Sequence, residues 1–508
     1  MQAYRPITLP LLASVLLAGC ASTHLPPSVN EIATPLPAQW QATQPHNGQL
    51  QDLRNWWQQF QDPLLLELID AAQKVSPTLS AARSQIEQAR SNRVAAGAAL
   101  LPQANFSASS ARAVARSNTA PATTSQAALG FGNAQLPYWD LDLFSGNRAT
   151  RDAAQERLAG SQAQWHDARV AVAAEVAGEY LNWRTCSMLE LVLAQDSLSR
   201  NATARLTHIS SSAGFAPQSN AALAQAGAAQ ARSSLASQHA QCELSVKNLV
   251  ALTAIDEPAL RLRLAPVALP SGLQADATGA LPLTSATIAA LVLPQPQSLA
   301  IDSLPAQVIA QRPDVFRAER ELMAARAEVA ATYATKLPQV TLGGSIGRIN
   351  VLSRGATSNA DTWSVGPLSL NLPLWDWGQH NAAIAAATAR YDDAASSYLA
   401  RVRGAVKEVE QALVNLQSAG ARNGDAFIAA TGYLSSVQAA EQRYHAGLGS
   451  LVELEDTRRV ALQAEQALLG LQLERANAWI ALYRAAGGGW QRPEATANSS
   501  ATAAPTTP

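Results

Sequence analysis

The residues best placed to do chemistry are three acidic side chains that follow a glycine late in the chain. Glu453, Glu455 and Asp456 lie six to nine residues after Gly447. Carboxylates at this density can transfer protons, bind cations or set the charge of a passage. They can also be a solvated helix start, because carboxylates are favourable beside the positive end of a helix dipole. The surrounding elements have to decide among these alternatives.

Signatures of catalysis and of bound cofactors are missing from the sequence. The seven His include no His-Glu-x-x-His pattern, and neither Cys-x-x-Cys nor a glycine-rich phosphate loop occurs. With 37 Lys and Arg against 38 Asp and Glu, the formal charge is −1, which gives no electrostatic reason to expect nucleic acid. We therefore predict a protein that is not an enzyme and that binds no metal and no dissociable cofactor.

The N-terminus predicts export and lipidation. Residues 7–19 form an apolar run behind Arg5, too short to span a bilayer but typical of a secretory signal, here 1–19. The run ends in Leu-Ala-Gly-Cys, which resembles a bacterial lipoprotein processing site with Cys20 as the acylated residue. An ordinary signal peptide that happens to end in Cys is the alternative. Ala21 after the cysteine favours, by resemblance to lipoprotein sorting, an outer membrane protein that is lipid-anchored and extends into the periplasm.

Proline is distributed in a way that predicts very long helices. None occurs between Pro137 and Pro217 or between Pro373 and Pro493. Since proline costs about 3 kcal/mol in a helix interior, these gaps favour uninterrupted helices. Only 15% of residues are charged, which suits helices packed closely on one another. We predict helices at 64–100, 147–210, 218–254, 314–336, 378–444 and 451–486.

The chain reads as two similar halves. Leu-Pro-Gln at 101 returns at 337, and Ala-Gly at 213 returns at 446, with two further landmarks at offsets between 230 and 236 residues. A period this long predicts a tandem duplication rather than a solenoid. The predicted organisation is a signal at 1–19, a lipidated arm at 20–62, a first repeat at 63–257, a proline-rich connection at 258–305, a second repeat at 306–490 and a disordered tail at 491–508.

Each half also carries two candidate strands with alternating polarity. Polar and apolar residues alternate over 103–109, 138–143, 339–346 and 368–374. Over 138–143, Asp140 and Asp142 share one face, which needs water, while the other face is apolar or aromatic. A half-buried strand of a soluble protein would show the same alternation, but the combination is typical of a water-filled transmembrane barrel. Four strands cannot close a barrel in lipid, so three chains are expected to supply twelve.

Several motifs resemble the bacterial outer membrane efflux proteins, the TolC-like outer membrane factors. They follow the order of that family and extend from about residue 50 to 490. Together with Cys20 they point to its lipoprotein branch. The motifs are Trp56–Pro63, Leu304–Pro305, Gln311–Asp314, Ala318–Arg320, Arg443–Leu448 and Leu482–Trp490.

The resemblance implies a fold of long α-helices forming a coiled-coil tunnel, with four transmembrane strands per chain. It implies a homotrimer with a twelve-strand barrel, docked on a periplasmic adaptor (membrane fusion protein) and an inner membrane efflux pump. The expected function is an exit duct for drugs or other small toxic solutes. A duct for secreted proteins and a non-conducting structural lipoprotein spacer stay open as alternatives.

The same resemblance gives the acidic residues a role. In the family, acidic residues after the second tip glycine face the pore and constrict it. Glu453 and Asp456 fall at these positions, and Glu455 lies between them. We therefore expect a gate at Asp456, Glu453 and Glu455. Three copies around an axis would concentrate negative charge and favour cations.

The two tips are the expected contacts for the adaptor. Gly214 with Phe215, and Gly447 with Leu448, fall at the turns between the long helices and the returning ones. Ordinary helix punctuation by glycine is the alternative reading. The first tip departs from the family at Asn220, where an acidic residue is common, so a gate there is not predicted.

The two remaining cysteines predict a disulfide. If the first hairpin turns near residue 214, Cys186 and Cys242 each lie about 28 residues from the turn and face each other on antiparallel helices. The periplasm is oxidising, which favours a bond over two free buried thiols.

Overall fold

The computed structural model describes residues 25–32, 36, 37, 39, 41, 53–116, 124–268, 292–296, 305–353 and 356–493. Cys20, the predicted signal and most of the connection and tail lie outside them. Two compact units divide the chain. Unit 1 comprises Met1–Thr34, Ser84–Ala163 and Arg317–Ala400, and unit 2 comprises Pro35–Arg83, Gln164–Phe316 and Arg401–Pro508. Among the described residues, no helix is both long and apolar enough to cross a membrane.

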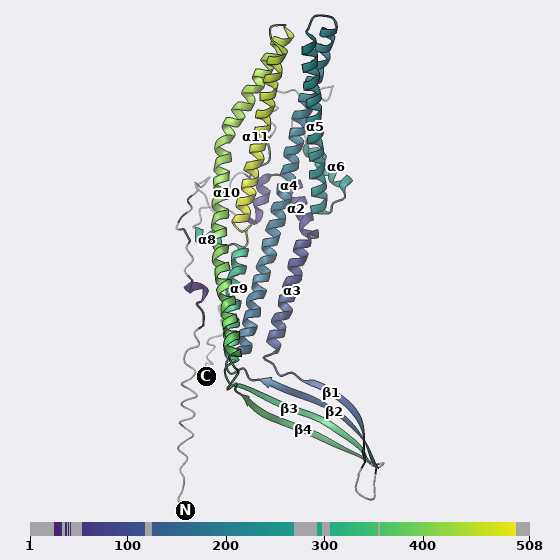
Figure 1. Ribbon diagram of the computed structural model, residues 1–508, viewed down its shortest axis with the longest axis vertical. Helices are drawn as coiled ribbons and strands as arrows, with labels where there is room; N and C mark the ends of the chain where they lie inside the picture. The colour runs from purple at the N-terminus through teal and green to yellow at the C-terminus, as the bar shows by residue number, and fades with distance from the viewer. Residues whose placement is uncertain are drawn as a thin grey trace, which may run out of the picture. The chain divides into compact units, whose positions relative to one another are not determined.

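The element order repeats once along the chain (Figure 1). A helix, two strands, a 67-residue helix and a returning helix occur in each half, so that each long helix is about 100 Å long. The first set is α3 (Pro77–Ala98), β1 (Asn105–Arg116), β2 (Thr124–Asp140), α4 (Gly146–Ser212) and α5 (Gln218–Thr253). The second is α9 (Pro313–Ala334), β3 (Gln339–Ser353), β4 (Ala356–Asn371), α10 (Gln379–His445) and α11 (Leu451–Ala485). Shorter helices are η1 (Val29–Glu31), η2 (Leu53–Phe60), α2 (Pro63–Val75), α6 (Glu257–Ala268) and α8 (Pro305–Ala310).

One predicted helix is wrong in its extent. Most of residues 64–100 form two helices, α2 and α3, because Ser76 leaves the helical conformation before Pro77, with φ −58° and ψ 122°. Proline disfavours a helical conformation of the residue before it and lacks the N–H that would continue the helix. Pro77 instead starts α3, where a missing donor has no cost.

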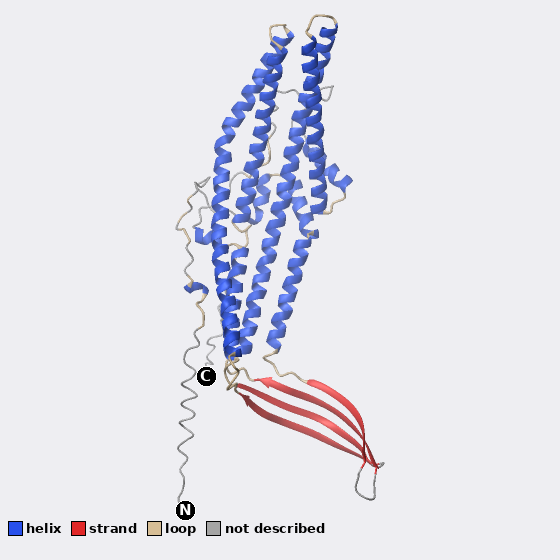
Figure 2. Cartoon of the chain, viewed as in Figure 1, coloured by secondary structure: helices blue, strands red, loops and turns tan. Residues whose placement is uncertain are grey.

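The four strands form one antiparallel sheet in the order β1-β2-β3-β4 (Figure 2). Directly paired residues share a face, so the register divides the side chains near the helices into two sets. We call one set the apolar face: Phe106, Ala134, Leu136, Trp139, Val340, Leu342, Ile346, Trp363, Val365, Leu368 and Leu370. The opposite set, the polar face, holds Asn105, Ser107, Asn133, Gln135, Asp140, Thr341, Ser345, Thr362, Ser364 and Ser369.

The strands differ from the prediction at both ends. They extend far beyond the alternating segments, through stretches of Ala, Ser and Gly whose polarity hardly alternates. The predicted strand 138–143 is wrong beyond Asp140, where β2 ends. Asp142 is buried and accepts hydrogen bonds from the Asn147 N–H at 2.9 Å and the Arg148 N–H at 3.1 Å. It therefore caps α4 and does not lie beside Asp140 on a strand face.

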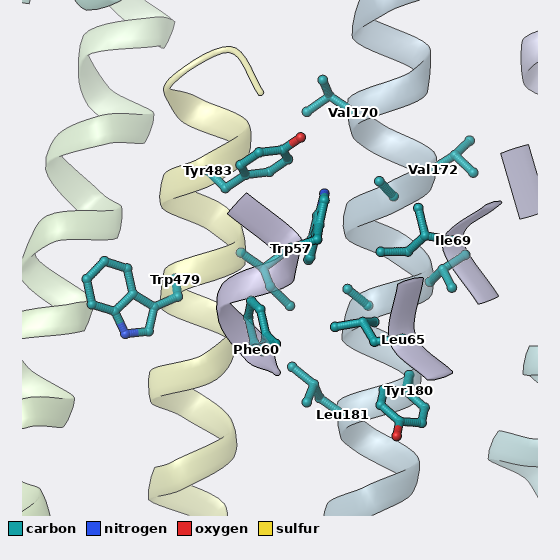
Figure 3. Close-up of a cluster of buried hydrophobic side chains, with 14 of the residues drawn as sticks. Trp57, Phe60, Leu65, Ile69, Val170, Val172, Tyr180, Leu181, Trp479 and Tyr483 are labelled. Carbon is teal, nitrogen blue, oxygen red and sulfur yellow. The ribbon is translucent and has the colours of Figure 1, made fainter. Parts of the chain in front are cut away.

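Unit 2 has an aromatic core around the segment that precedes α2 (Figure 3). Trp56 is fully buried and stacks on Tyr483 of α11 with ring centroids 4.6 Å apart. Asp62 caps α2 by accepting the Leu64 N–H, and also accepts the Tyr180 hydroxyl at 2.7 Å. Burial is the main cause that raises the pKa of Tyr180 above its ordinary value. The segment from Trp56 to Asp62 therefore contacts both α4 and α11 and fixes the start of α2 against them.

A buried arginine joins the start of α9 to α10 and α11. Arg312 is 5% exposed and donates to the Ala485 carbonyl at 3.0 Å, where α11 ends. It also pairs with Asp314 at 2.8 Å and Glu408 at 2.6 Å. The turn that follows α11 leaves no room for a side chain at Gly487. A Cβ on this residue would lie 2.3 Å from the Gln311 carbonyl oxygen. Gly487, directly after α11, is therefore in close contact with the backbone of the segment before α9.

We predict that Arg312→Met lowers the free energy of unfolding by about 3–5 kcal/mol, because it removes the close partner of Asp314 and leaves the Ala485 carbonyl without the donor that Arg312 supplies. The apparent midpoint of thermal unfolding of the purified protein measures this. Arg401→Met is the matched control, since Arg401 is exposed and 3.9 Å from Asp314. Equal midpoints for the two variants would contradict the assignment.

Candidate functional site

Two helical turns in unit 2 form the tips of the α4–α5 and α10–α11 hairpins, side by side in Figure 1. Both turns use the same backbone motif. The Phe215 N–H donates to the Ser210 carbonyl, and the Leu448 N–H donates to the Arg443 carbonyl, each at 2.8 Å. Gly214 and Gly447 have φ of +81° and +72°, which this helix ending requires and which glycine adopts without strain.

The residues after these glycines point into solvent. In this motif an apolar side chain usually packs back on the last turn of its own helix. Phe215 and Leu448 are instead 87% and 74% exposed. The tips therefore present one large apolar side chain each.

The acidic segment starts α11 directly after the second tip. The Ser450 hydroxyl accepts the Glu453 N–H at 3.1 Å and caps the helix. Glu453 pairs with Arg443 at 2.6 Å, and Asp456 pairs with Arg459 at 3.2 Å, both at exposed positions. At i and i+3, Glu453 and Asp456 lie on the same face of the helix.

Glu455 points elsewhere. Its carboxylate pairs with Arg200 of α4 and with Arg458, the latter at 3.0 Å, and its side chain is largely buried. The structure thus separates Glu455 from the two exposed acids that were predicted with it. The first tip offers no counterpart, because Pro217 caps α5 without a side-chain hydrogen bond and the first turn of α5 has no acidic residue.

Arg458 is the centre of a polar cluster between the hairpins. It is 6% exposed and donates to Ser199 at 2.7 Å, Thr203 at 3.0 Å and Glu441 at 2.6 Å. We define the inter-hairpin cluster as Ser199, Arg200 and Thr203 of α4, Glu441 of α10, and Glu455 and Arg458 of α11. Nearer the tip, the hydroxyls of Thr207 and Tyr444 lie 3.1 Å apart.

Sequence reasoning missed this cluster. Arg458 follows Glu455 by one helical turn, which was the available signal, but its partners on α4 are more than 250 residues away. Such pairs cannot be read from local spacing. The described part of the chain contains no group of three or more His, Cys, Asp or Glu able to hold a metal ion.

The disulfide predicted in the first hairpin is present in the structure. The sulfurs of Cys186 on α4 and Cys242 on α5 are 2.05 Å apart, with a Cα–Cα distance of 5.5 Å. Between the bond and the tip, Arg232 of α5 donates to Asn201 of α4. The two helices of this hairpin are thus held together by covalent and polar contacts.

A buried carboxyl group lies beside the same region. Glu465 of α11 is 6% exposed. Burial, and then the charge of Asp196 on α4, raise the pKa of Glu465 to about 7. Asp196 is itself paired with Arg200 at 2.9 Å, which connects this carboxyl group to the inter-hairpin cluster.

The comparisons with known proteins agree with this architecture. The sequence profile described as "Outer membrane efflux protein" matches residues 68–254 and 304–488. The chain is 29% identical to the pyoverdine export outer membrane protein OpmQ of Pseudomonas putida, over 97% of this chain and 98% of that one. It is 28% identical to the toluene efflux pump outer membrane protein TtgI of the same species, over 95% and 98%.

Solved structures share the fold. The outer-membrane channel OprN superposes with a TM-score of 0.75 at 24% identity, over 91% of this chain and 99% of that one. The MtrE outer membrane channel of Neisseria gonorrhoeae, in its open state, gives 0.73 at 23% identity, over 92% and 98%.

The long helices and the four-stranded sheet define a TolC-like fold. Since the family profile covers most of the chain, this protein belongs to the outer membrane efflux protein family. It is the outer membrane channel of an efflux system and a transport protein, not an enzyme.

We predict that Arg458→Met costs about 3–5 kcal/mol locally, because it leaves the Glu441 and Glu455 carboxylates without their buried partner. Hydrogen exchange of the amides at 199–207 and 437–444 should become faster. The control is Arg459→Met, which removes an exposed pair with Asp456 worth about 0–1 kcal/mol. Exchange unchanged in Arg458→Met would show that the cluster does not hold the hairpins.

Glu465 predicts a pH dependence of stability. Its pKa is about 7 in the folded protein, above the ordinary value of 4.5, so the folded state keeps this proton to a higher pH than the unfolded state does. The free energy of unfolding therefore falls as the pH rises from 4.5 to 7. Glu465→Gln removes this loss, and its thermal midpoint should exceed that of the unmodified protein more at pH 8 than at pH 5. Glu474→Gln, at an exposed pair with Arg422, is the control. Parallel pH profiles would refute the assignment.

Proposed function

We propose that the chain forms a homotrimer whose twelve strands close a barrel in the outer membrane, with the helices continuing as a tunnel through the periplasm. The sheet carries this proposal. Near the helices its apolar side chains are exposed, as Trp363 is at 77% and Val365 at 81%, while polar side chains occupy the opposite face. In the described sheet β1 and β4 each lack a partner on one side. In lipid those edges need hydrogen bonds, which the neighbouring copies supply.

Aromatic side chains support the position of this sheet in a bilayer. Trp363 lies on the apolar face at its far end, and Trp375 and Trp377, both exposed, follow β4 near the helices. Aromatic rings are favourable at the two boundaries of a membrane, because one part of the ring is apolar and another polar. Acylation of Cys20 adds a lipid anchor on the periplasmic side.

The partners are a periplasmic adaptor, or membrane fusion protein, and an inner membrane efflux pump. Gly214, Phe215, Gly447 and Leu448 form the contact with the adaptor, because the tips expose the apolar side chains Phe215 and Leu448. The cargo consists of drugs or other small toxic solutes. The names of relatives support small molecules, since they refer to solvent, toluene and pyoverdine export.

The gate is formed by Glu453 and Asp456, which are exposed on one face of α11 beside the tip. Glu455 contributes in a different way, because it binds Arg200 and Arg458 and so holds the hairpins together in the closed channel. Three copies of the two exposed acids around the axis attract cations and constrict the passage.

Single-channel conductance in a planar bilayer tests the duct and its gate together. We expect the unmodified protein to conduct weakly and to prefer cations, and Glu453→Gln/Asp456→Asn to lose that preference because the ring of charge is gone. Glu474→Gln removes an exposed acid of the same helix and is the matched control.

The outcomes separate the alternatives. Selectivity unchanged in the double variant would keep the duct and move the gate elsewhere. No conductance in any variant, from protein shown to be folded and trimeric, would favour a structural spacer.

A further inference from the structure

The apolar face of the sheet changes character toward the end away from the helices. The row formed by Phe106, Ala134, Ile346 and Trp363 is the last that is wholly apolar. In the next row on the same face, Arg348 stands opposite Asp361. Two residues along an antiparallel strand advance about 7 Å, so the change from apolar to charged is abrupt.

The charged and amide side chains continue beyond this row. Asn350 stands opposite Asn359, and the following row holds Arg112 together with Leu352 and Thr357. Arg112, Arg348 and both asparagines are exposed. The same face therefore presents, from the helices outward, an apolar band, an aromatic residue, and a polar zone that contains two arginines.

Arg348 is held in a defined orientation. Its Nε and Nη2 donate to the two carboxylate oxygens of Asp361 at 2.6 and 3.0 Å, and both side chains are more than half exposed. A bidentate pair fixes the plane of the guanidinium group. The net charge of the side chains named in this zone is still positive, because there are two arginines, Arg112 and Arg348, and one carboxylate, Asp361.

We propose that Arg112 and Arg348 bind lipid headgroups in the outer leaflet of the membrane that carry phosphate and a net negative charge. This rests on the proposed barrel, in which the apolar face contacts lipid and the end away from the helices lies outside. The first charged row then lies where the hydrocarbon ends, at the level of the headgroups. Guanidinium groups match phosphate oxygens in geometry and charge.

Lipid retention in native mass spectrometry tests the proposal on the purified full-length protein, with equal amounts of phosphatidylglycerol and phosphatidylcholine as probes. The unmodified protein should retain phosphatidylglycerol preferentially. Arg112→Gln should lower that retention about five-fold, from the typical contribution of one arginine near an anionic surface. Asp361→Asn should raise it, because Arg348 then has no carboxylate partner and turns to phosphate.

Arg90→Gln is the matched control, since Arg90 is exposed on α3, outside the sheet, and pairs with Glu87 at 2.8 Å. A similar loss of lipid in Arg90→Gln, or a fall with Asp361→Asn, would overturn the proposal. Dissociation of the trimer in Arg112→Gln would also overturn it, by showing that Arg112 binds a second copy of the chain.

Conductance separates this proposal from the one it rests on. If the unmodified protein conducts but shows no preference for phosphatidylglycerol, the headgroup site is wrong and the barrel stands. If the unmodified protein neither inserts nor conducts, the barrel is wrong, and the headgroup site with it.

Discussion

Backbone hydrogen bonding in lipid is the constraint on which the architecture depends. A strand in hydrocarbon has no water to satisfy its N–H and C=O groups, and each unsatisfied group costs several kcal/mol. The described sheet satisfies them along β2 and β3, between which the register is nearly continuous, and leaves one side of β1 and of β4 without a strand partner. In the proposed barrel, the requirement for oligomerisation follows from the strand number. The residues on the two faces only decide which side contacts lipid.

Charge is scarce in the chain, and the buried charges occur where separate segments must meet. Asp62 joins the cap of α2 to Tyr180 and Arg184 of α4. Arg312 joins the start of α9 to the end of α11 and to α10. Each is paired and hydrogen-bonded, as burial of an ion requires. Because removing one partner is far more costly than removing both, such sites specify which helices are neighbours.

Much of the fold could be predicted from the sequence because helix ends carry local signals. The absence of proline over long stretches and the glycines at 214 and 447 placed the long helices and their turns to within two residues. The strands were predicted only near the helices, where polar and lipid-facing residues alternate. The outer parts of β1 and β2 are rich in Ala, Ser and Gly, which fit either face and leave no periodic signal.

The site was predicted less completely, for a physical reason. Glu453 and Asp456 stand beside a glycine turn, which is a local feature. Glu455 cannot be distinguished from them in the sequence. In the structure it pairs with Arg200, which is distant in the chain, and therefore does not share the exposed position of the other two acids. Asp142 was misassigned likewise, because the cap of α4 competes with continuation of β2 for the same residue.

The distribution of polar and apolar contacts indicates which part of the helical unit can move. Away from the tips, Met188 and Val192 of α4 pack with Leu469 of α11 in an apolar cluster. Nearer the tips, the contacts between the hairpins include the inter-hairpin cluster and the Thr207–Tyr444 pair. Apolar contacts lose their stabilisation when they separate. Polar groups that become exposed form hydrogen bonds to water in exchange, so part of their loss is regained.

The first hairpin is further held by its disulfide and by the Arg232–Asn201 contact, so its two helices should move as one body. In the proposed channel, opening at the tips would tilt the second hairpin away from the first, with the apolar cluster as the fixed end. Two contacts would oppose that motion. Arg458 of α11 is buried and donates to Ser199 and Thr203 of α4, and Glu455 of α11 pairs with Arg200 of α4.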